Sequence, residues 1–137
     1  MAADIRKVTE SFSVAPQIEP EDVAAAKAQG FVKLINNRPD GEVPGQPTSA
    51  EMEAAARAAG LDYVHIPFVG RPTQAQAEAV AKEAEAAVGP VLAFCRSGTR
   101  SITAWSIGQA LAGRHTPGEL VGLAADAGYD LSPVLGG

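Results

Sequence analysis

A chain of 137 residues, 46% of them hydrophobic, is long enough and apolar enough to form a buried core, so we expect one domain spanning residues 1–137. The 20% content of charged residues and the mean hydropathy near zero are typical of a globular protein and exclude a disordered chain. The net charge of −5 and the pI of about 4.9 argue against a surface that binds nucleic acid. Any anion-binding site must therefore be local.

The amino-terminal residues contain no apolar signal core, and no stretch reaches the ~18 apolar residues of a membrane span. We therefore expect a cytoplasmic protein that does not contact the membrane. The only cysteine, Cys95, has no internal disulfide partner, and with just two histidines no ligand set is spaced for a structural zinc site. We expect neither a metal nor another cofactor, and the lone thiol is either an inert core residue or a reactive group.

Strands and helices are expected to alternate in chain order. Polar–apolar alternation or short apolar runs predict strands over residues 11–18, 31–36, 63–68 and 91–94. Capping residues, apolar periodicity and terminal glycines predict helices over residues 20–30, 48–60, 73–87 and 99–113, and from residue 116. No strand is expected after Cys95. This order predicts an α/β fold with a mainly parallel central sheet flanked by helices, in which ligands bind beyond the carboxyl ends of the strands.

The loop Cys95-Arg96-Ser97-Gly98-Thr99-Arg100 joins the predicted buried strand 91–94 to a helix. The amino terminus of a helix directs backbone N–H groups and a positive dipole toward one point, which attracts anions and favours a cysteine thiolate. Gly98 permits the positive φ that would turn N–H groups inward, and Arg100 can clamp tetrahedral oxygens with two parallel hydrogen bonds. The loop therefore predicts a nucleophilic Cys95 in an anion-binding site.

The candidate site extends beyond Cys95 and Arg100. The predicted anion-binding residues are Arg96, Ser97, Gly98, Thr99, Arg100 and Ser101, and the hydroxyl of Ser101 is placed to hydrogen-bond the sulfur when it leaves. Two alternatives stay open. Cys95 can be a small buried hydrophobic residue that ends a strand, and Arg96 can form only a surface ion pair.

The segment from Cys95 to Ser101 resembles the phosphate-binding loop of cysteine-dependent protein phosphatases, with one residue fewer between cysteine and arginine. The shorter spacing is also that of rhodanese-type sulfurtransferases. The order of elements resembles dual-specificity phosphatases, because rhodanese domains usually continue past the cysteine into a further strand. Over nearly the whole chain the sequence resembles a bacterial phosphatase-like domain also found attached to beta-lactamase hydrolase-like proteins, with segment 36–42 and the loop itself as hallmarks. The resemblance implies a fold like that of protein tyrosine phosphatases and dual-specificity phosphatases.

The chain departs from the dual-specificity pattern at the general acid. Those enzymes place an aspartate a few residues after the pair that corresponds to Ile66-Pro67, whereas residues 68–71 here contain no carboxylate. Asp40 and Glu42 follow an earlier strand and are expected at the same edge of a parallel sheet, so either can protonate a leaving group. We take Asp40 as the candidate acid. The alternative is that Asp40 only forms a turn with its neighbours.

The leading hypothesis is a phosphatase-like hydrolase that attacks phosphate monoesters through Cys95 and a phosphocysteine intermediate. The second is a sulfurtransferase that carries a persulfide on Cys95, which explains both the short loop and the missing acid. The third is a non-catalytic anion-binding module, which the presence of the cysteine disfavours. In the first two cases the partner is a small anionic substrate, either a phosphate ester or a sulfane-sulfur donor.

Overall fold

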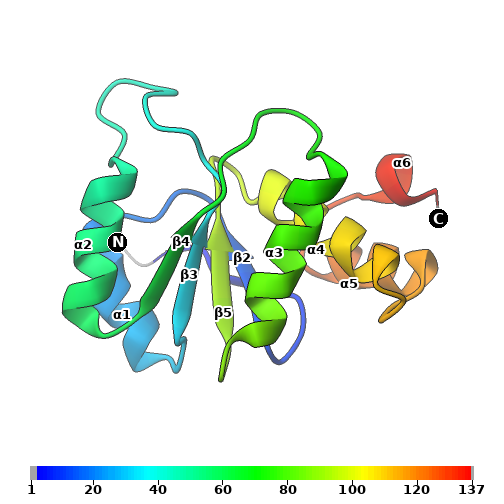
Figure 1. Ribbon diagram of the computed structural model, residues 1–137, viewed down its shortest axis with the longest axis horizontal. Coiled ribbons are helices and arrows are strands. Elements are labelled where there is room, and N and C mark those ends of the chain that lie inside the picture. The colour runs from blue at the N-terminus through cyan, green and yellow to red at the C-terminus, as the bar shows by residue number, and fades with distance from the viewer. Residues whose placement is uncertain (1–2, 137) are drawn as a thin grey trace.

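The computed structural model describes residues 3–136 and contains a five-stranded sheet with helices on both faces (Figure 1). The strands are β1 (Arg6–Lys7), β2 (Phe12–Ala15), β3 (Lys33–Asn36), β4 (Asp62–His65) and β5 (Val91–Phe94). The helices are η1 (Pro20–Asp22), a 3₁₀ turn, α1 (Val23–Ala28), α2 (Ser49–Ala59), α3 (Gln74–Ala86), α4 (Thr99–Leu111), α5 (Pro117–Asp126) and α6 (Ser132–Leu135).

The sheet order, β1-β2-β5-β3-β4, places β5 at the centre. Strand β1 is antiparallel to β2, and all other neighbours are parallel. Ala15 of β2 and Asn36 of β3 both lie opposite Phe94 of β5, and His65 of β4 lies opposite Asn36. Because these four strands end level with one another, the residues that follow them gather at one edge. Cys95 follows the central strand.

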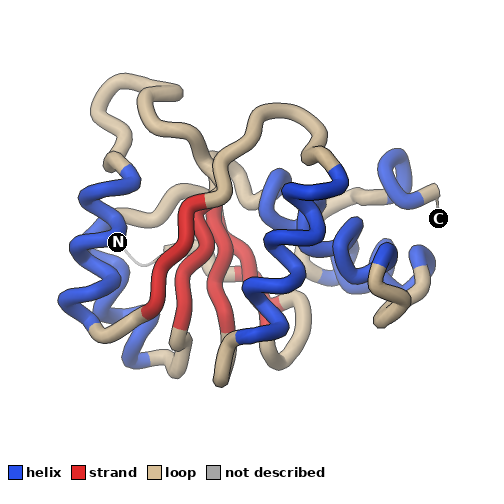
Figure 2. Tube along the Cα trace, in the orientation of Figure 1, coloured by secondary structure: helices blue, strands red, loops and turns tan. Residues whose placement is uncertain are grey.

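Alternate residues of β5 face two separate apolar cores. Leu92 and Phe94 lie in a core that is covered by α1 and α2, whereas Val91 and Ala93 lie in a core that is covered by α3, α4 and α5. All four residues of β5 are completely buried, as expected for a parallel strand between two helical layers. Figure 2 shows the strands between these two groups of helices.

Local sequence signals define the helix ends. Thr48, Thr73 and Thr116 each accept a hydrogen bond from the backbone N–H three residues later, and the side chain of that later residue bonds back to the threonine N–H. These are the reciprocal bonds of a capping box. Helix α2 ends at Gly60, whose φ of +83° is the left-handed geometry that glycine adopts without steric penalty.

The predicted α/β class, the mainly parallel sheet and the lack of a strand after Cys95 within the described residues are confirmed. Two short elements were not predicted, the edge strand β1 and the one-turn helix α6. The predicted strand over 63–68 is shorter than expected and ends at His65. None of the helices within residues 3–136 combines the length and apolar composition that a membrane crossing requires.

Candidate active site

Cys95 lies at the centre of the sheet edge, directly after β5, and its side chain is completely buried. The backbone N–H of Gly98 donates a hydrogen bond to its sulfur over 3.0 Å. An N–H group directed at a sulfur stabilises negative charge on it. The sulfur therefore accepts a backbone hydrogen bond, although the exposure of the side chain is that of a core residue.

Gly98 forms the turn that leads from Cys95 into α4. Its φ is +93°, and a Cβ added there would lie 2.2 Å from the hydroxyl oxygen of Tyr129. Both the backbone conformation and the close contact require glycine. The turn leaves the backbone N–H groups of Arg100 and Ser101 in the first turn of α4 without an acceptor among the described residues. Unpaired N–H groups at a helix amino terminus are available to bind an anion.

Arg100, in the first turn of α4, is held by Glu42 and by the backbone of Phe68. Its Nη1 and Nη2 donate to the two carboxylate oxygens of Glu42 over 2.9 and 2.8 Å, and Nη1 also donates to the carbonyl oxygen of Phe68 over 3.0 Å. The pKa of Arg100 is raised, first by the hydrogen bonds to Glu42 and then, against the effect of burial, by its interaction with Cys95. The guanidinium is therefore close enough to Cys95 for the two side chains to interact.

Counting the donors of Arg100 shows which edge of the guanidinium is free. A guanidinium has five N–H donors, and three of them are used by Glu42 and Phe68. The remaining two, on Nε and Nη2, are parallel along one edge of the group and have no acceptor among the described residues. Two parallel donors are the arrangement that binds a carboxylate or phosphate bidentately.

Glu42 reaches Arg100 because the loop after β3 is fixed at its start. Asn37 donates from its backbone to Phe94 of β5 over 2.8 Å and from its side chain to Ile66, just after β4, over 2.9 Å. These bonds join three strand ends. Asn37 is completely buried, so its position is set by the sheet itself.

Arg38 and Gln46 hold the rest of this loop. The guanidinium of Arg38 is buried; it donates to Glu42 over 2.8 Å and to Gln17, from the loop after β2, over 3.1 Å. Gln46 accepts from the N–H of Glu42 and donates to Pro39. The carboxylate of Glu42 is thus fixed between two arginines.

The pKa of Glu42 is lowered to about 2, mainly by the hydrogen bonds from Arg100 and also by those from Arg38, while burial opposes the shift. Glu42 is therefore ionised at neutral pH and has no proton to give. This removes one of the two carboxyl groups that the sequence suggests as general acids. Two arginines around one carboxylate also leave a local charge of +1 in a protein of net charge −5.

The side chains of the other predicted loop residues lie in different environments. Those of Arg96, Ser97 and Thr99 are exposed, and Ser97 donates to Thr99 over 3.0 Å. Ser101 is completely buried, and its hydroxyl has no hydrogen-bond partner among the described residues. The structure thus brings Cys95 and Arg100 together with the loop backbone, and it leaves the Arg96 side chain in solvent.

Asp40 lies in the same loop as Glu42, but its carboxylate is not bonded to Arg100. Its Oδ1 accepts from the backbone N–H of Ser49 over 2.7 Å, at the start of α2. The side chain of Asp40 is exposed. Asp40 therefore has a structural contact with a helix amino terminus, which the alternative turn interpretation partly anticipates.

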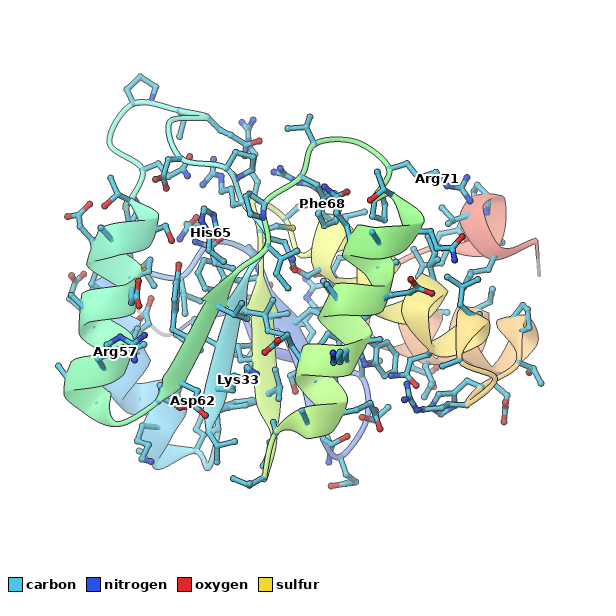
Figure 3. All side chains as sticks on the ribbon, viewed as in Figure 1. Lys33, Arg57, Asp62, His65, Phe68 and Arg71 are labelled. Carbon is cyan, nitrogen blue, oxygen red and sulfur yellow. The ribbon has the colours of Figure 1, made fainter. Side chains whose placement is uncertain are left out.

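Figure 3 shows the two ends of the sheet. Lys33 and Asp62 mark the amino-terminal ends of β3 and β4, whereas His65 and Phe68 lie at the opposite end, where the candidate site is. The ring Nε2 of His65 is 2.8 Å from the carbonyl oxygen of Arg38, so His65 supports the loop after β3. Arg71 lies farther along the connection from β4 to α3 and is exposed.

Sequence reasoning missed three residues that support the site. Gln17 accepts a hydrogen bond from Arg38, and Gln46 donates one to Pro39. Tyr129 donates from its hydroxyl to the carbonyl oxygen of Ser97 over 2.9 Å. A glutamine or tyrosine in a loop gives no local signal of such a role. Within the described residues, no three His, Cys, Asp or Glu side chains are grouped so as to hold a metal ion.

The chain is similar in sequence to known proteins. The family model of the beta-lactamase hydrolase-like protein, phosphatase-like domain, matches residues 4–112. The Beta-lactamase hydrolase-like protein of Agrobacterium fabrum is 40% identical over 126 residues, which are 91% of this chain and 29% of that protein. The chain thus spans less than a third of the length of this relative.

Solved structures give the same result. A candidate phosphatase from Neisseria meningitidis superposes with a TM-score of 0.85 at 30% identity, covering 97% of this chain and 94% of the other. Tk-PTP in its active form superposes with a TM-score of 0.71 at 17% identity, covering 91% and 85%, which shows a shared protein tyrosine phosphatase-like fold. By its sequence match and its fold, the chain belongs to the phosphatase-like domain family of the beta-lactamase hydrolase-like proteins.

Proposed function

We propose that this domain is a cysteine-dependent phosphatase-like hydrolase that acts on small phosphate monoesters through a phosphocysteine on Cys95. One observation carries the proposal: the two unused donors of Arg100 and the unpaired N–H groups of the first turn of α4 occur together in the loop that begins at Cys95. Together these donors suit the three non-bridging oxygens of a phosphoryl group. The chemistry needs no metal or cofactor. The positive charge that matches the substrate is confined to this site, which disfavours nucleic acid and membrane surfaces as partners.

The reaction takes place in two steps. The Cys95 thiolate attacks phosphorus, so that an S–P bond forms while the P–O bond to the leaving group breaks, and the departing alkoxide takes up a proton. A water molecule then attacks the phosphocysteine, forming a new P–O bond and breaking the S–P bond, which releases inorganic phosphate and restores the thiolate. Arg100 and the N–H groups bind the same oxygens in both steps.

Asp40 is the proposed acid for the first step. Glu42 is excluded by its pKa of about 2, and no carboxylate occurs between residues 68 and 71. Asp40 is exposed, and only one of its carboxylate oxygens accepts a hydrogen bond from a described residue, so the other is free to carry a proton to a leaving group.

The same observations favour a second candidate function, sulfur transfer. No carboxyl group in the described residues both contacts Arg100 and can be protonated at neutral pH, because Glu42 is the one that contacts it. In sulfur transfer from thiosulfate, the Cys95 thiolate attacks the outer sulfur, an S–S bond forms, and sulfite leaves with the electron pair of the old bond. Sulfite needs no proton to leave, so this reaction requires no general acid.

Mass spectrometry of the intact protein distinguishes the two functions. After incubation with an aryl phosphate and rapid acid quenching, we expect a phosphoryl group on Cys95, and after incubation with thiosulfate no stable added sulfur. The Cys95→Ser variant, which keeps the loop and lacks the thiolate, should accept neither group. An added sulfur without any phosphoryl group would replace the phosphatase proposal by sulfur transfer, and an unmodified Cys95 in both cases would leave a buried, inert thiol.

A further inference from the structure

Tyr129, in the segment between α5 and α6, contacts the anion-binding loop from outside. Its hydroxyl donates to the carbonyl oxygen of Ser97 over 2.9 Å, although the two residues are 32 positions apart in the sequence. Figure 1 shows this segment leaving α5 and passing beside the start of α4 before it reaches α6. The residue lies beyond the stretch 4–112 that matches the family model, so the family match gives it no role.

The carbonyl of Ser97 and the N–H of Gly98 belong to one peptide group. The oxygen end of that group accepts from Tyr129 over 2.9 Å, and the N–H end donates to the sulfur of Cys95 over 3.0 Å. The peptide bond is planar, so a donor that fixes the oxygen also fixes the direction of the N–H. Hydrogen bonds in such a chain also polarise one another, which strengthens the hydrogen bond from the Gly98 N–H to the sulfur.

Tyr129 is itself held in place. The guanidinium of Arg6, on β1, lies 5.5 Å from the centre of the tyrosine ring and also donates to the carbonyl oxygen of Ala127 over 3.2 Å. On the other side, the tyrosine hydroxyl fills the space where a side chain at position 98 would project. Burial raises the pKa of Tyr129, so its hydroxyl keeps its proton at neutral pH and remains a donor.

We propose that Tyr129 is a positioning residue for Cys95: its hydroxyl orients and polarises the Ser97–Gly98 peptide, so that the Gly98 N–H stabilises the thiolate. The proposal rests on the proposed function, since a stabilised thiolate matters only if Cys95 is the nucleophile. The segment between α5 and α6, which carries Tyr129, would then act on the nucleophile of the loop.

Other charged or titratable groups also act on the thiol and must be kept constant in the test. Arg100 faces it from α4, with Glu42 and Arg38 of the loop after β3 behind it. Arg6 lies behind Tyr129, and the adjacent Arg96 has an exposed side chain. A Tyr129→Phe substitution changes none of these groups and removes only one hydroxyl.

The test is the pH dependence of alkylation of Cys95 by iodoacetamide, followed by mass spectrometry, in the wild-type protein and in Tyr129→Phe. Since Cys95 is the only cysteine, the signal is unambiguous. We expect the inflection of the rate to move to higher pH by on the order of 0.5 pH unit when the hydroxyl is lost. In a ¹⁵N-labelled sample, the amide proton of Gly98 should also shift upfield as its hydrogen bond to the sulfur weakens.

Tyr63→Phe is the matched control, because the Tyr63 hydroxyl is also hydrogen-bonded, to Asn36 and Ser49, and does not contact the loop. It should leave the inflection at the wild-type pH. The proposal is overturned if Tyr129→Phe titrates like the wild type, even with a lower melting temperature, or if Tyr63→Phe shifts the inflection equally. The titration needs no turnover, so a protein that forms no phosphocysteine would overturn the proposed function and still test the role of Tyr129.

Discussion

Glu42 binds Arg100 with both of its carboxylate oxygens, at 2.8 and 2.9 Å, across 58 residues of sequence. Arg38 donates to the same carboxylate over 2.8 Å. The charge of Glu42 therefore orients Arg100, and the lowered pKa of Glu42 is a consequence of that ion pair. A carboxylate in this position sets the direction of the free edge of Arg100 and does not supply protons.

This ion pair predicts a pH dependence of stability. The folded-state pKa of Glu42, about 2, lies below its ordinary value of 4.5, so its contribution to the free energy of unfolding is complete above pH 4.5 and is lost as the pH falls through 2. In urea titrations, Glu42→Gln should be less stable than the wild type at pH 7, and the difference should shrink as the pH falls from 4.5 toward 2.

Glu10→Gln is the control, because Glu10 forms an exposed ion pair with Lys7, which contributes little to stability. Its difference from the wild type should be small at every pH. A gap between Glu42→Gln and the wild type that stayed constant down to pH 2 would mean that Glu42 contributes by packing and not by its charge.

Arg100→Lys tests the bidentate edge. Lysine keeps the positive charge but lacks the planar pair of donors, so kcat/KM for an aryl phosphate should fall on the order of 10²-fold, equivalent to ~2.7 kcal/mol of transition-state binding. Arg57→Lys, at an exposed arginine of α2 that pairs with Glu53, is the matched control and should retain wild-type kinetics. Equal kcat/KM values for the two variants would show that Arg100 acts only as a point charge.

Asp40 requires two substitutions, because its carboxylate also accepts a hydrogen bond at the start of α2. Asp40→Asn keeps an oxygen for the N–H of Ser49 and removes the acid, whereas Asp40→Ala removes both. For a phosphatase with Asp40 as acid, Asp40→Asn should lose rate mainly on alkyl phosphates, whose leaving groups need a proton, and little on activated aryl phosphates.

Asp40→Ala should show the same kinetic pattern with an additional loss of stability of about 1 kcal/mol from the missing helix contact. If Asp40→Asn loses the same fraction of its rate on substrates with good and with poor leaving groups, Asp40 shapes the loop and the assignment of the acid has to be withdrawn. Unchanged sulfur uptake from thiosulfate in Asp40→Asn is the pattern expected of a sulfurtransferase.

Gly108 controls the packing of α4 against α3. A Cβ at this position would lie 2.5 Å from the carbonyl oxygen of Ala77 and 2.6 Å from the Cβ of Ala81. Gly108→Ala should therefore lower the free energy of unfolding by about 1–3 kcal/mol, as overpacking does. Gly122→Ala, in α5 with no atom within 4 Å, should raise it by up to ~1 kcal/mol through helix propensity. Denaturation curves in which both variants match the wild type would mean that α4 packs loosely against α3.

The sequence predicts those parts of the fold that depend on local interactions. The capping boxes at Thr48, Thr73 and Thr116 involve residues three apart, so they are visible in the sequence before any tertiary contact is known. Strand β1 is different. Arg6 and Lys7 form a strand only because β2 is available to pair with them, and two polar residues have no strand pattern of their own.

The same distinction divides the site. The loop from Cys95 to Arg100 is contiguous, so the residue types and their spacing suffice to predict an anion site there. The bond from Glu42 to Arg100 and the bond from Tyr129 to Ser97 join distant segments, and they depend on how loops fold over a level sheet edge. For that reason the sequence indicates Glu42 only as a possible acid and gives no indication of a role for Tyr129.

The position of β5 between β2 and β3 has a consequence for synthesis on the ribosome. Strands β2 and β3 emerge early but do not pair with each other, since both pair with β5. A nascent chain that stops before Val91 therefore has a sheet with its middle strand missing, and its apolar strand edges stay open until that strand emerges. Cys95 is the next residue to be made. The thiol thus enters the chain only when the strand that completes the middle of the sheet has been made.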